Sequence, residues 1–158
     1  MRLDLTINDR PVIWEVRPGE MLLEALRSHD LKGAKLVCGT GDCCACTVVM
    51  DGLSINSCSF LALQARGGTI TTVEGLAKPD GSLHPLQRAF LEAGAAQCGF
   101  CTPGFLMRSY VFLQQTPHPS EDQVRHALAG NICRCTGYVK PVEAVLRAAE
   151  LMAAESLG

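Results

Sequence analysis

The sequence has no strong charge of either sign and no long apolar run. Its 158 residues carry 14 Lys and Arg against 16 Asp and Glu, a formal net charge of −2, and the basic residues form no cluster. Nucleic-acid-binding domains typically show a basic face, so this charge balance argues against that class of partner. No apolar stretch approaches the roughly 18 residues that a membrane-spanning helix needs. We therefore expect neither nucleic acid nor a membrane span.

Signals for export and for common catalytic sites are missing as well. Residues 1–8 alternate apolar and polar like a strand and contain neither a signal peptide nor a twin-arginine pair. The glycines at 39 and 41 lack the third glycine of a dinucleotide fingerprint, and there is no P-loop. The histidines are scattered, and we expect surface positions for them: His29, His84, His118 and His126. The sequence predicts a cytoplasmic protein without a substrate pocket of its own.

What the chain does have is nine cysteines, eight of which fall into two sets of four. Disulfides are rare in the cytoplasm, so this number favours metal ligation. The first set has the spacing C-x4-C-x2-C followed by a distant fourth cysteine, which is the plant-type ferredoxin pattern for a [2Fe–2S] cluster. Nearby glycines permit the tight turns that point backbone N–H groups at cluster sulfurs. The first set is Cys38, Cys43, Cys46 and Cys58, and the second is Cys98, Cys101, Cys133 and Cys135.

Zinc is the main alternative, because Zn²⁺ also takes four thiolates. Its usual ligand pairs are C-x2–4-C twice over, and the long gap between Cys46 and Cys58 fits that pattern poorly. The spacing of the second set leaves iron–sulfur and zinc both open. A thioredoxin-like motif at Cys98-x2-Cys101 lacks the expected βαβ context. Both cysteine pairs of this set precede predicted helices, whose dipoles should lower the thiol pKa values.

The pattern of apolar residues predicts an α+β chain of two domains, residues 1–76 and 77–158. Alternation predicts hairpins over 3–16 and 47–56 and a strand over 69–73, and helical spacing predicts a helix over about 20–29. The Gly- and Pro-containing stretch 75–81 is the best linker. Four helices should follow, at about 85–93, 102–115, 120–130 and 141–149. Thr102 before Pro103 reads as an N-cap, and Ser120 with Gln123 as a capping box.

Four segments together resemble the iron–sulfur subunit of molybdenum hydroxylases, the family of xanthine dehydrogenase, aerobic carbon monoxide dehydrogenase and aromatic-ring hydroxylases. The resemblance covers about residues 3–150. It rests on Cys38-Gly-Thr-Gly-Asp-Cys-Cys-Ala-Cys-Thr-Val48, Asn56-Ser-Cys58, Gln97-Cys-Gly-Phe-Cys-Thr-Pro-Gly104 and Gly130-Asn-Ile-Cys-Arg-Cys-Thr-Gly-Tyr138.

The resemblance implies a plant-ferredoxin-like β-grasp domain followed by a four-helix bundle, each with one [2Fe–2S] cluster. The first cysteine set would hold an outer cluster, and the second an inner cluster beside the molybdopterin of a large partner subunit. Gln97 and Cys135 would lie nearest the pterin. Electrons would pass from molybdenum through the inner and outer clusters to the FAD of a medium subunit, or in some relatives to a cytochrome. The implied assembly is a dimer of heterotrimers.

Two positions depart from the family pattern, which usually has glycine in place of Cys44 and often in place of Val37. If the first of these positions needs a positive φ, a cysteine there is strained by about 1 kcal/mol or more. We read Cys44 as a small thiol packed beside the cluster. The alternative is a substitute ligand or a redox-sensitive thiol.

Two other functions compete with that of an electron-transfer subunit. The chain could be a free-standing ferredoxin-like carrier with exchangeable partners. The helical half argues against this, because a shuttle needs only one exposed cluster. The other competitor is a zinc-stabilised interaction module. The resemblance implies a subunit that does not itself touch the substrate of the complex.

Overall fold

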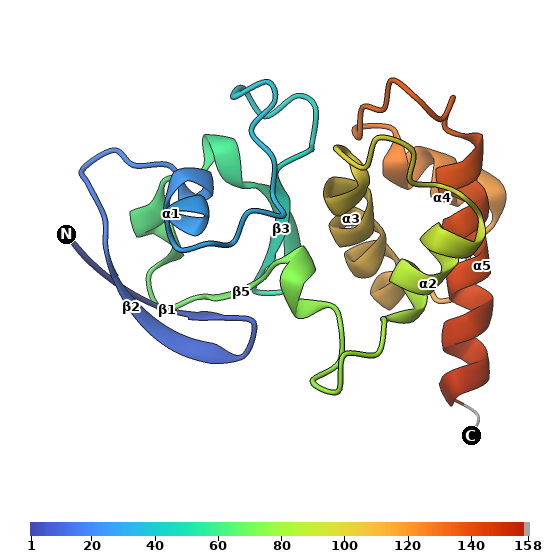
Figure 1. Ribbon diagram of the computed structural model, residues 1–158, viewed down its shortest axis with the longest axis horizontal. Coiled ribbons are helices and arrows are strands. Elements are labelled where there is room, and N and C mark those ends of the chain that lie inside the picture. Colours follow the sequence, from blue (N-terminus) through green and yellow to red (C-terminus); the bar gives the residue numbers. More distant parts are fainter. Residues whose placement is uncertain (157–158) are drawn as a thin grey trace.

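The computed structural model describes residues 1–156 and shows a sheet half followed by a helical half (Figure 1). In the described part of the chain the strands form one mixed sheet in the order β2-β1-β5-β3-β4, in which β1 and β5 are parallel and the other neighbours antiparallel. Short 3-10 helices cover 57–59, 62–65 and 73–75. The elements are β1 Arg2–Ile7, β2 Arg10–Glu15, α1 Leu22–Ser28, β3 Thr47–Met50, β4 Leu53–Asn56 and β5 Thr69–Thr71.

The two predicted hairpins are confirmed, and their turns explain them. Asn8 and Asp9 have φ of 47° and 63°, and Asp51 and Gly52 have φ of 48° and 82°. Two consecutive positive φ values are what a two-residue hairpin turn requires, and Asn, Asp and Gly tolerate them best. The first turn fixes the register of β1 and β2, which places the buried Leu3 opposite the buried Trp14.

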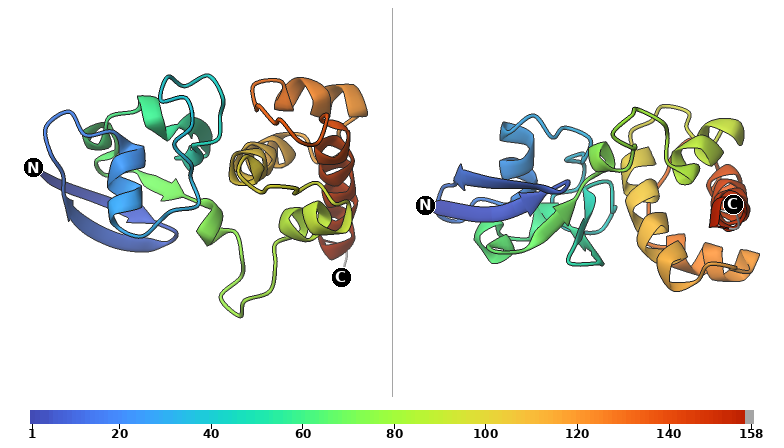
Figure 2. Two further views of the ribbon diagram at one scale, coloured as in Figure 1. Left: turned by 45° about the horizontal axis from the view of Figure 1, so that its top comes forward. Right: turned by 90° about the horizontal axis from the view of Figure 1, so that it is seen from below.

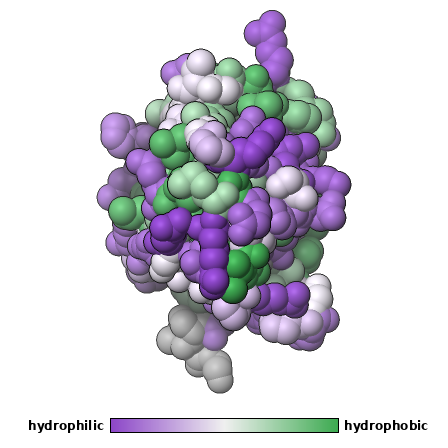
Figure 3. Space-filling view, turned by 90° about the vertical axis from the view of Figure 1, so that its left-hand side faces the viewer, coloured by the Kyte–Doolittle hydropathy of each residue, from purple (hydrophilic) through white to green (hydrophobic). Residues whose placement is uncertain are grey.

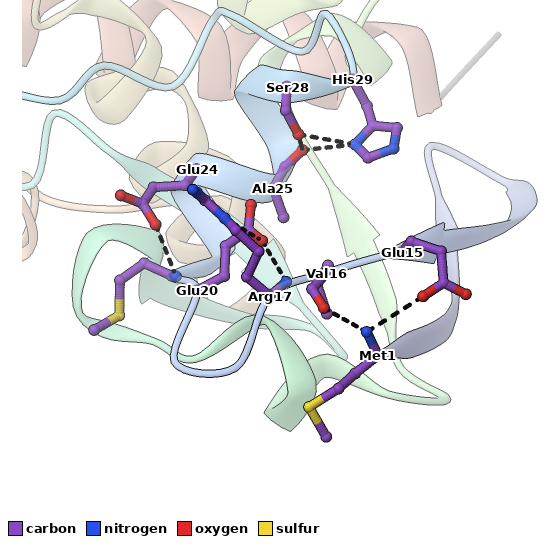
Figure 4. Close-up of polar contacts among 10 residues, drawn as sticks. Met1, Glu15, Val16, Arg17, Glu20, Glu24, Ala25, Ser28 and His29 are labelled. Carbon is purple, nitrogen blue, oxygen red and sulfur yellow. Dashed lines mark hydrogen bonds and ion pairs between the residues drawn. The ribbon is translucent and has the colours of Figure 1, made fainter.

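Local contacts fix the beginning of α1 and the edge of the sheet (Figure 4). The carboxylate of Glu24 accepts a hydrogen bond of 3.3 Å from the Met21 amide, which satisfies a donor at the helix start. The amine of Met1 donates to the Val16 carbonyl at 2.6 Å, which ties the first strand to the end of the second. Trp14 is buried as a core residue, and its ring stacks on His29 with the centroids 4.1 Å apart.

The helical half contains, within residues 77–156, the four predicted helices: α2 Pro85–Glu92, α3 Thr102–Gln115, α4 Glu121–Leu128 and α5 Val139–Ser156. The predicted capping box is confirmed, because the Ser120 hydroxyl accepts from the Gln123 amide and the Gln123 side chain accepts from the Ser120 amide. The predicted N-cap of α3 is wrong by one residue. Thr102 is already helical, and Cys101 occupies the cap without a side-chain bond.

His84 is not the surface residue that we expected. Its ring is half-buried, its Nδ1 accepts a 3.1 Å hydrogen bond from the Leu86 amide, and it packs edge-on against Tyr110. It is the N-cap of α2, ahead of the proline at the first helical position. Burial lowers the pKa of His84, although Glu155 opposes this and Lys78 adds to it.

Each half has its own core, and β3 lies between the two cores. Val48 packs into the sheet core, whereas Val49, on the opposite face of the strand, packs into the helical core. In both views of Figure 2, α3 lies alongside the part of the sheet that contains β3. The far end of the sheet half shows apolar side chains scattered among polar ones (Figure 3). Among residues 1–156, no helix is both long and apolar enough to cross a membrane.

Candidate metal centres

The first cysteine loop precedes β3 and bends through a series of left-handed residues. Gly39 and Gly41 have φ of 73° and 85°, as the predicted tight turns require. The Thr40 amide donates a 3.4 Å hydrogen bond to the sulfur of Cys38. The side chain of Asn56 donates to the Gly41 carbonyl at 2.6 Å and thereby anchors the loop to β4.

The thiols of this first set lie in two pairs. Cys38 is exposed, and contacts with Thr40 and then Cys43 lower its pKa to about 5. Cys46 and Cys58 are buried and interact with each other. Burial, together with the side chain of Cys58, raises the pKa of Cys46 to about 12. Cys38 therefore lies at the surface with the buried Cys43 beside it, whereas Cys46 and Cys58 lie inside the sheet core.

The second set also lies in pairs, drawn from segments more than 30 residues apart. The Cys101 thiol interacts with Cys133, and the Cys98 thiol interacts with Cys135. Burial and the neighbouring Cys133 raise the pKa of Cys101 to about 12. Our expectation of a lowered pKa at this helix start is wrong for Cys101, because burial opposes the thiolate more strongly than a helix end favours it. The pKa of Cys135 is also raised, chiefly by its hydrogen bond with Cys98.

Cys133 takes part in a ring of three hydrogen bonds within its own loop. The Thr136 hydroxyl donates to the Cys133 sulfur at 3.1 Å, the Cys133 amide donates to the Tyr138 hydroxyl at 3.2 Å, and the Tyr138 amide donates to the Thr136 oxygen at 3.3 Å. Burial acts to raise the pKa of Cys133, but the hydrogen bonds around it, first that of Thr136, bring the pKa below its usual value. Sequence reasoning missed Thr136 and Tyr138, although both belong to the quoted motif.

The donor set fits a two-iron cluster in each half. Among residues 1–156, no three or more His, Cys, Asp or Glu side chains lie together as a group that could hold a metal ion. Instead the eight thiols form two pairs in each half. A [2Fe–2S] core has four thiolate ligands, two on each iron, so pairs at either end are the arrangement that it needs.

The two cysteine loops touch each other where the halves meet. The Cys43 carbonyl accepts a 3.1 Å hydrogen bond from the amide of Ile132, the residue before Cys133. Gly104, in the first turn of α3, lies so close to the Cys44 carbonyl that a Cβ at this position would clash with it. Backbone of the first loop therefore packs directly on backbone of the second half.

Cys44 has φ of 57°, so the positive φ anticipated for this position is confirmed. Its sulfur points toward the helical half, 3.6 Å from the point where a Cβ on Gly130 would lie. Burial raises its pKa. It lines a polar cavity of about 270 Å³ together with Asn56, Arg108 and Asn131.

Arg108 bridges the two halves here, because it donates to the Ser54 hydroxyl at 2.7 Å and to the Ala127 carbonyl at 3.0 Å.

Comparison with known proteins gives a consistent result over almost the whole chain. Residues 5–68 match the family model described as 2Fe-2S iron-sulfur cluster binding domain, and residues 72–146 match the model described as [2Fe-2S] binding domain. The nicotine 6-hydroxylase small subunit of Paenarthrobacter nicotinovorans is 48% identical over 149 residues, which cover 94% of this chain and 89% of that protein. The xanthine dehydrogenase iron–sulfur-binding subunit of Escherichia coli O157:H7 is 44% identical, with 91% of each chain covered.

Solved structures agree with the sequence relatives. A chain of quinoline 2-oxidoreductase from Pseudomonas putida 86 matches with a TM-score of 0.93 and 42% identity, covering 98% of this chain and 96% of that one. The aldehyde oxidoreductase of Desulfovibrio desulfuricans matches with the same TM-score at 41% identity, but this chain covers only 17% of it. The predicted α+β architecture, a ferredoxin-like domain followed by a helical domain, is thereby confirmed. The chain belongs to the family of iron–sulfur subunits of the molybdenum hydroxylases, which carry two [2Fe–2S]-binding domains.

Proposed function

We propose that this chain is the electron-transfer subunit of a heteromeric molybdenum-dependent hydroxylase or dehydrogenase. The observation that carries the proposal is the pairing of eight thiols into two sets, one in each half, whose loops touch. A [2Fe–2S] cluster, when bound, takes up and passes on one electron. The relay would run from the molybdopterin site through both clusters to a flavin subunit or another acceptor.

The proposed ligands follow the thiol pairs. Residues 1–76 form the first domain and hold the outer cluster, and residues 77–158, of which the last two lie outside the described part, form the second and hold the inner cluster. Each pair of thiols would supply the two ligands of one iron. The pairs are Cys38 with Cys43 and Cys46 with Cys58 in the first domain, and Cys98 with Cys135 and Cys101 with Cys133 in the second.

Exposure supports a direction for the relay. Gln97, Cys98 and Cys135 are all exposed at the edge of the second site, which is where a pterin on a large partner subunit would approach. Cys38 is exposed at the far edge of the first site, beside the side chains of residues 36 and 37, which are 60% and 56% exposed. This edge would face the FAD of a medium subunit or a cytochrome. The contact between the Cys43 and Ile132 backbones keeps the gap between the sites short.

The proposed assembly is a cytoplasmic dimer of heterotrimers. Support comes from the relatives, which include a small subunit of a hydroxylase and one subunit of a dehydrogenase complex. An obligate interface should bury roughly 2,000 Å² or more. Native mass spectrometry of cell extract is expected to show this chain bound to a large molybdenum-containing subunit, and a stable free monomer would contradict the assembly.

The order of the two sites can be tested in the native complex with Cys135→Ser and Cys43→Ser. In the first variant, substrate is expected to reduce molybdenum in a single turnover, while the first-domain cluster and the flavin stay oxidised. In the second variant, the helical cluster is expected to become reduced while the flavin stays oxidised. Rapid-freeze paramagnetic resonance distinguishes the two results, provided that both complexes assemble. Exchanged behaviour of the two variants would reverse the assignment of inner and outer sites.

A further inference from the structure

The loop from Cys133 to Tyr138 holds a hydroxyl whose only proton is directed at a cysteine sulfur. Thr136 receives the Tyr138 amide on its oxygen at 3.3 Å and donates to the Cys133 sulfur at 3.1 Å. The Cys133 amide completes the ring by donating to the Tyr138 hydroxyl at 3.2 Å. The Thr136 hydroxyl is the first of the hydrogen bonds to this sulfur, which also interacts with the Cys135 and Thr136 backbone and with the Cys101 thiol.

The backbone bends unusually to close this ring. Gly137 and Tyr138 have φ of 60° and 66°, and a left-handed conformation is uncommon for a residue as bulky as tyrosine. Cys133 itself is only 8% exposed, so the hydrogen bond to its sulfur acts where water screens little. A strained tyrosine and a buried acceptor indicate that the loop is built around this contact.

The first cysteine loop provides a natural comparison. Thr40 also lies beside a cysteine thiol, that of Cys38, but its hydroxyl donates to the carboxylate of Asp42. Cys38 accepts the Thr40 backbone amide at 3.4 Å and also interacts with the Thr40 side chain and with Cys43. Two threonines near cysteines therefore differ in where their single hydroxyl proton goes.

We infer that Thr136 is a positioning residue that raises the reduction potential of the cluster in the helical half, by donating its hydroxyl proton to the Cys133 sulfur. The inference rests on the proposed function, because it takes Cys133 as a ligand of that cluster. Reduction adds one negative charge to the cluster, so a donor to a ligand sulfur stabilises the reduced state more than the oxidised state. The hydroxyl proton of Thr40, by contrast, goes to the Asp42 carboxylate.

The test is a redox titration of the purified, cluster-loaded protein, followed by paramagnetic resonance. Thr136→Val removes the hydroxyl and keeps the shape, and we expect the potential of the helical cluster to shift to a more negative value. Thr136→Ser restores a hydroxyl and should return the potential to that of the wild type. Thr40→Val is the matched control in the other loop and should leave the helical cluster unchanged.

A second readout needs no variant. The reduced helical cluster of the wild type should show hyperfine coupling to an exchangeable proton that disappears in D₂O, and its absence would overturn the inference even if Thr136→Val failed to load iron. Equal shifts in the Val and Ser variants would also overturn it, because they would assign the effect to loop geometry. A wild type that lacks a helical-half cluster signal would instead contradict the proposed function.

Discussion

Each of the two cysteine sets has four thiols, but the two sets differ in how deeply their thiols are buried. In the sheet half, Cys43, Cys46 and Cys58 are all buried, and the last two belong to the hydrophobic core itself. In the helical half only Cys133 is buried within the core, Cys101 packs against that core, and Cys98 and Cys135 are exposed. The core itself is formed by large apolar side chains, among them Phe90, Phe105 and Met107. The proposed ligand thiols therefore lie mostly inside the core in the sheet half and mostly at the edge of the core in the helical half.

The largest expected effect is on stability after loss of one cluster. Cys46→Ser should remove the first-domain cluster and open the sheet half, because a buried ligand set left without metal cannot fill its core. Cys101→Ser should remove the other cluster while α3 and α5 keep their helical structure. Hydrogen exchange is the measurement, with strand β3 losing protection in the first variant. Equal loss of protection in both halves after either substitution would break the comparison.

The next effect concerns the contact between the halves. In an unobstructed helix, Gly→Ala stabilises by about 0.5–1 kcal/mol. Gly104→Ala should instead destabilise by about 1–3 kcal/mol, because the new Cβ meets the Cys44 carbonyl and overpacks the junction. Urea unfolding of the cluster-loaded protein gives the sign. A stabilised variant would show that the two halves can separate without cost.

A smaller effect is expected at Cys44. Cys44→Gly relieves the strain of a positive φ and should stabilise the protein by about 1 kcal/mol, with iron content and both paramagnetic signals retained. The sulfur faces the helical half, which is why we expect the cluster to remain. Loss of one cluster in this variant, together with tolerance of Cys43→Ser, would identify Cys44 as the true ligand.

The smallest effect is a pH dependence confined to the helical half. Burial places the folded-state pKa of His84 below its unfolded value of about 6.5, so the unfolded chain binds the proton first. Stability should therefore fall as the pH drops from 7 through the folded-state pKa. His84→Asn keeps an N-cap acceptor and should flatten this slope. Unfolding curves at pH 7 and pH 5 test it, and an unchanged slope would remove His84 from the account.

The sequence could predict what depends on local pattern. Both hairpins follow from alternation together with the turns at Asn8-Asp9 and Asp51-Gly52, whose residues suit positive φ. The strain at Cys44 followed from the glycine expected there. Ser120 and Gln123 predict the capping box, because both partners lie within one helical turn.

What the sequence could not predict depends on contacts between distant segments. The pairing of Cys101 with Cys133 joins the start of α3 to the loop between α4 and α5, and the bond from Ile132 to the Cys43 carbonyl joins the two halves. A helix start predicts a lowered pKa for Cys101, but the position in the sequence does not reveal the burial that raises this pKa. His84 could have been recognised, since it directly precedes a proline that begins a helix.

The most direct test of the central claim, two [2Fe–2S] clusters in one chain, is the metal content of anaerobically purified protein. We expect about four irons and about four acid-labile sulfides per chain, with two distinct paramagnetic signals after reduction. Stoichiometric zinc without iron, or iron and sulfide for one cluster only, would contradict it.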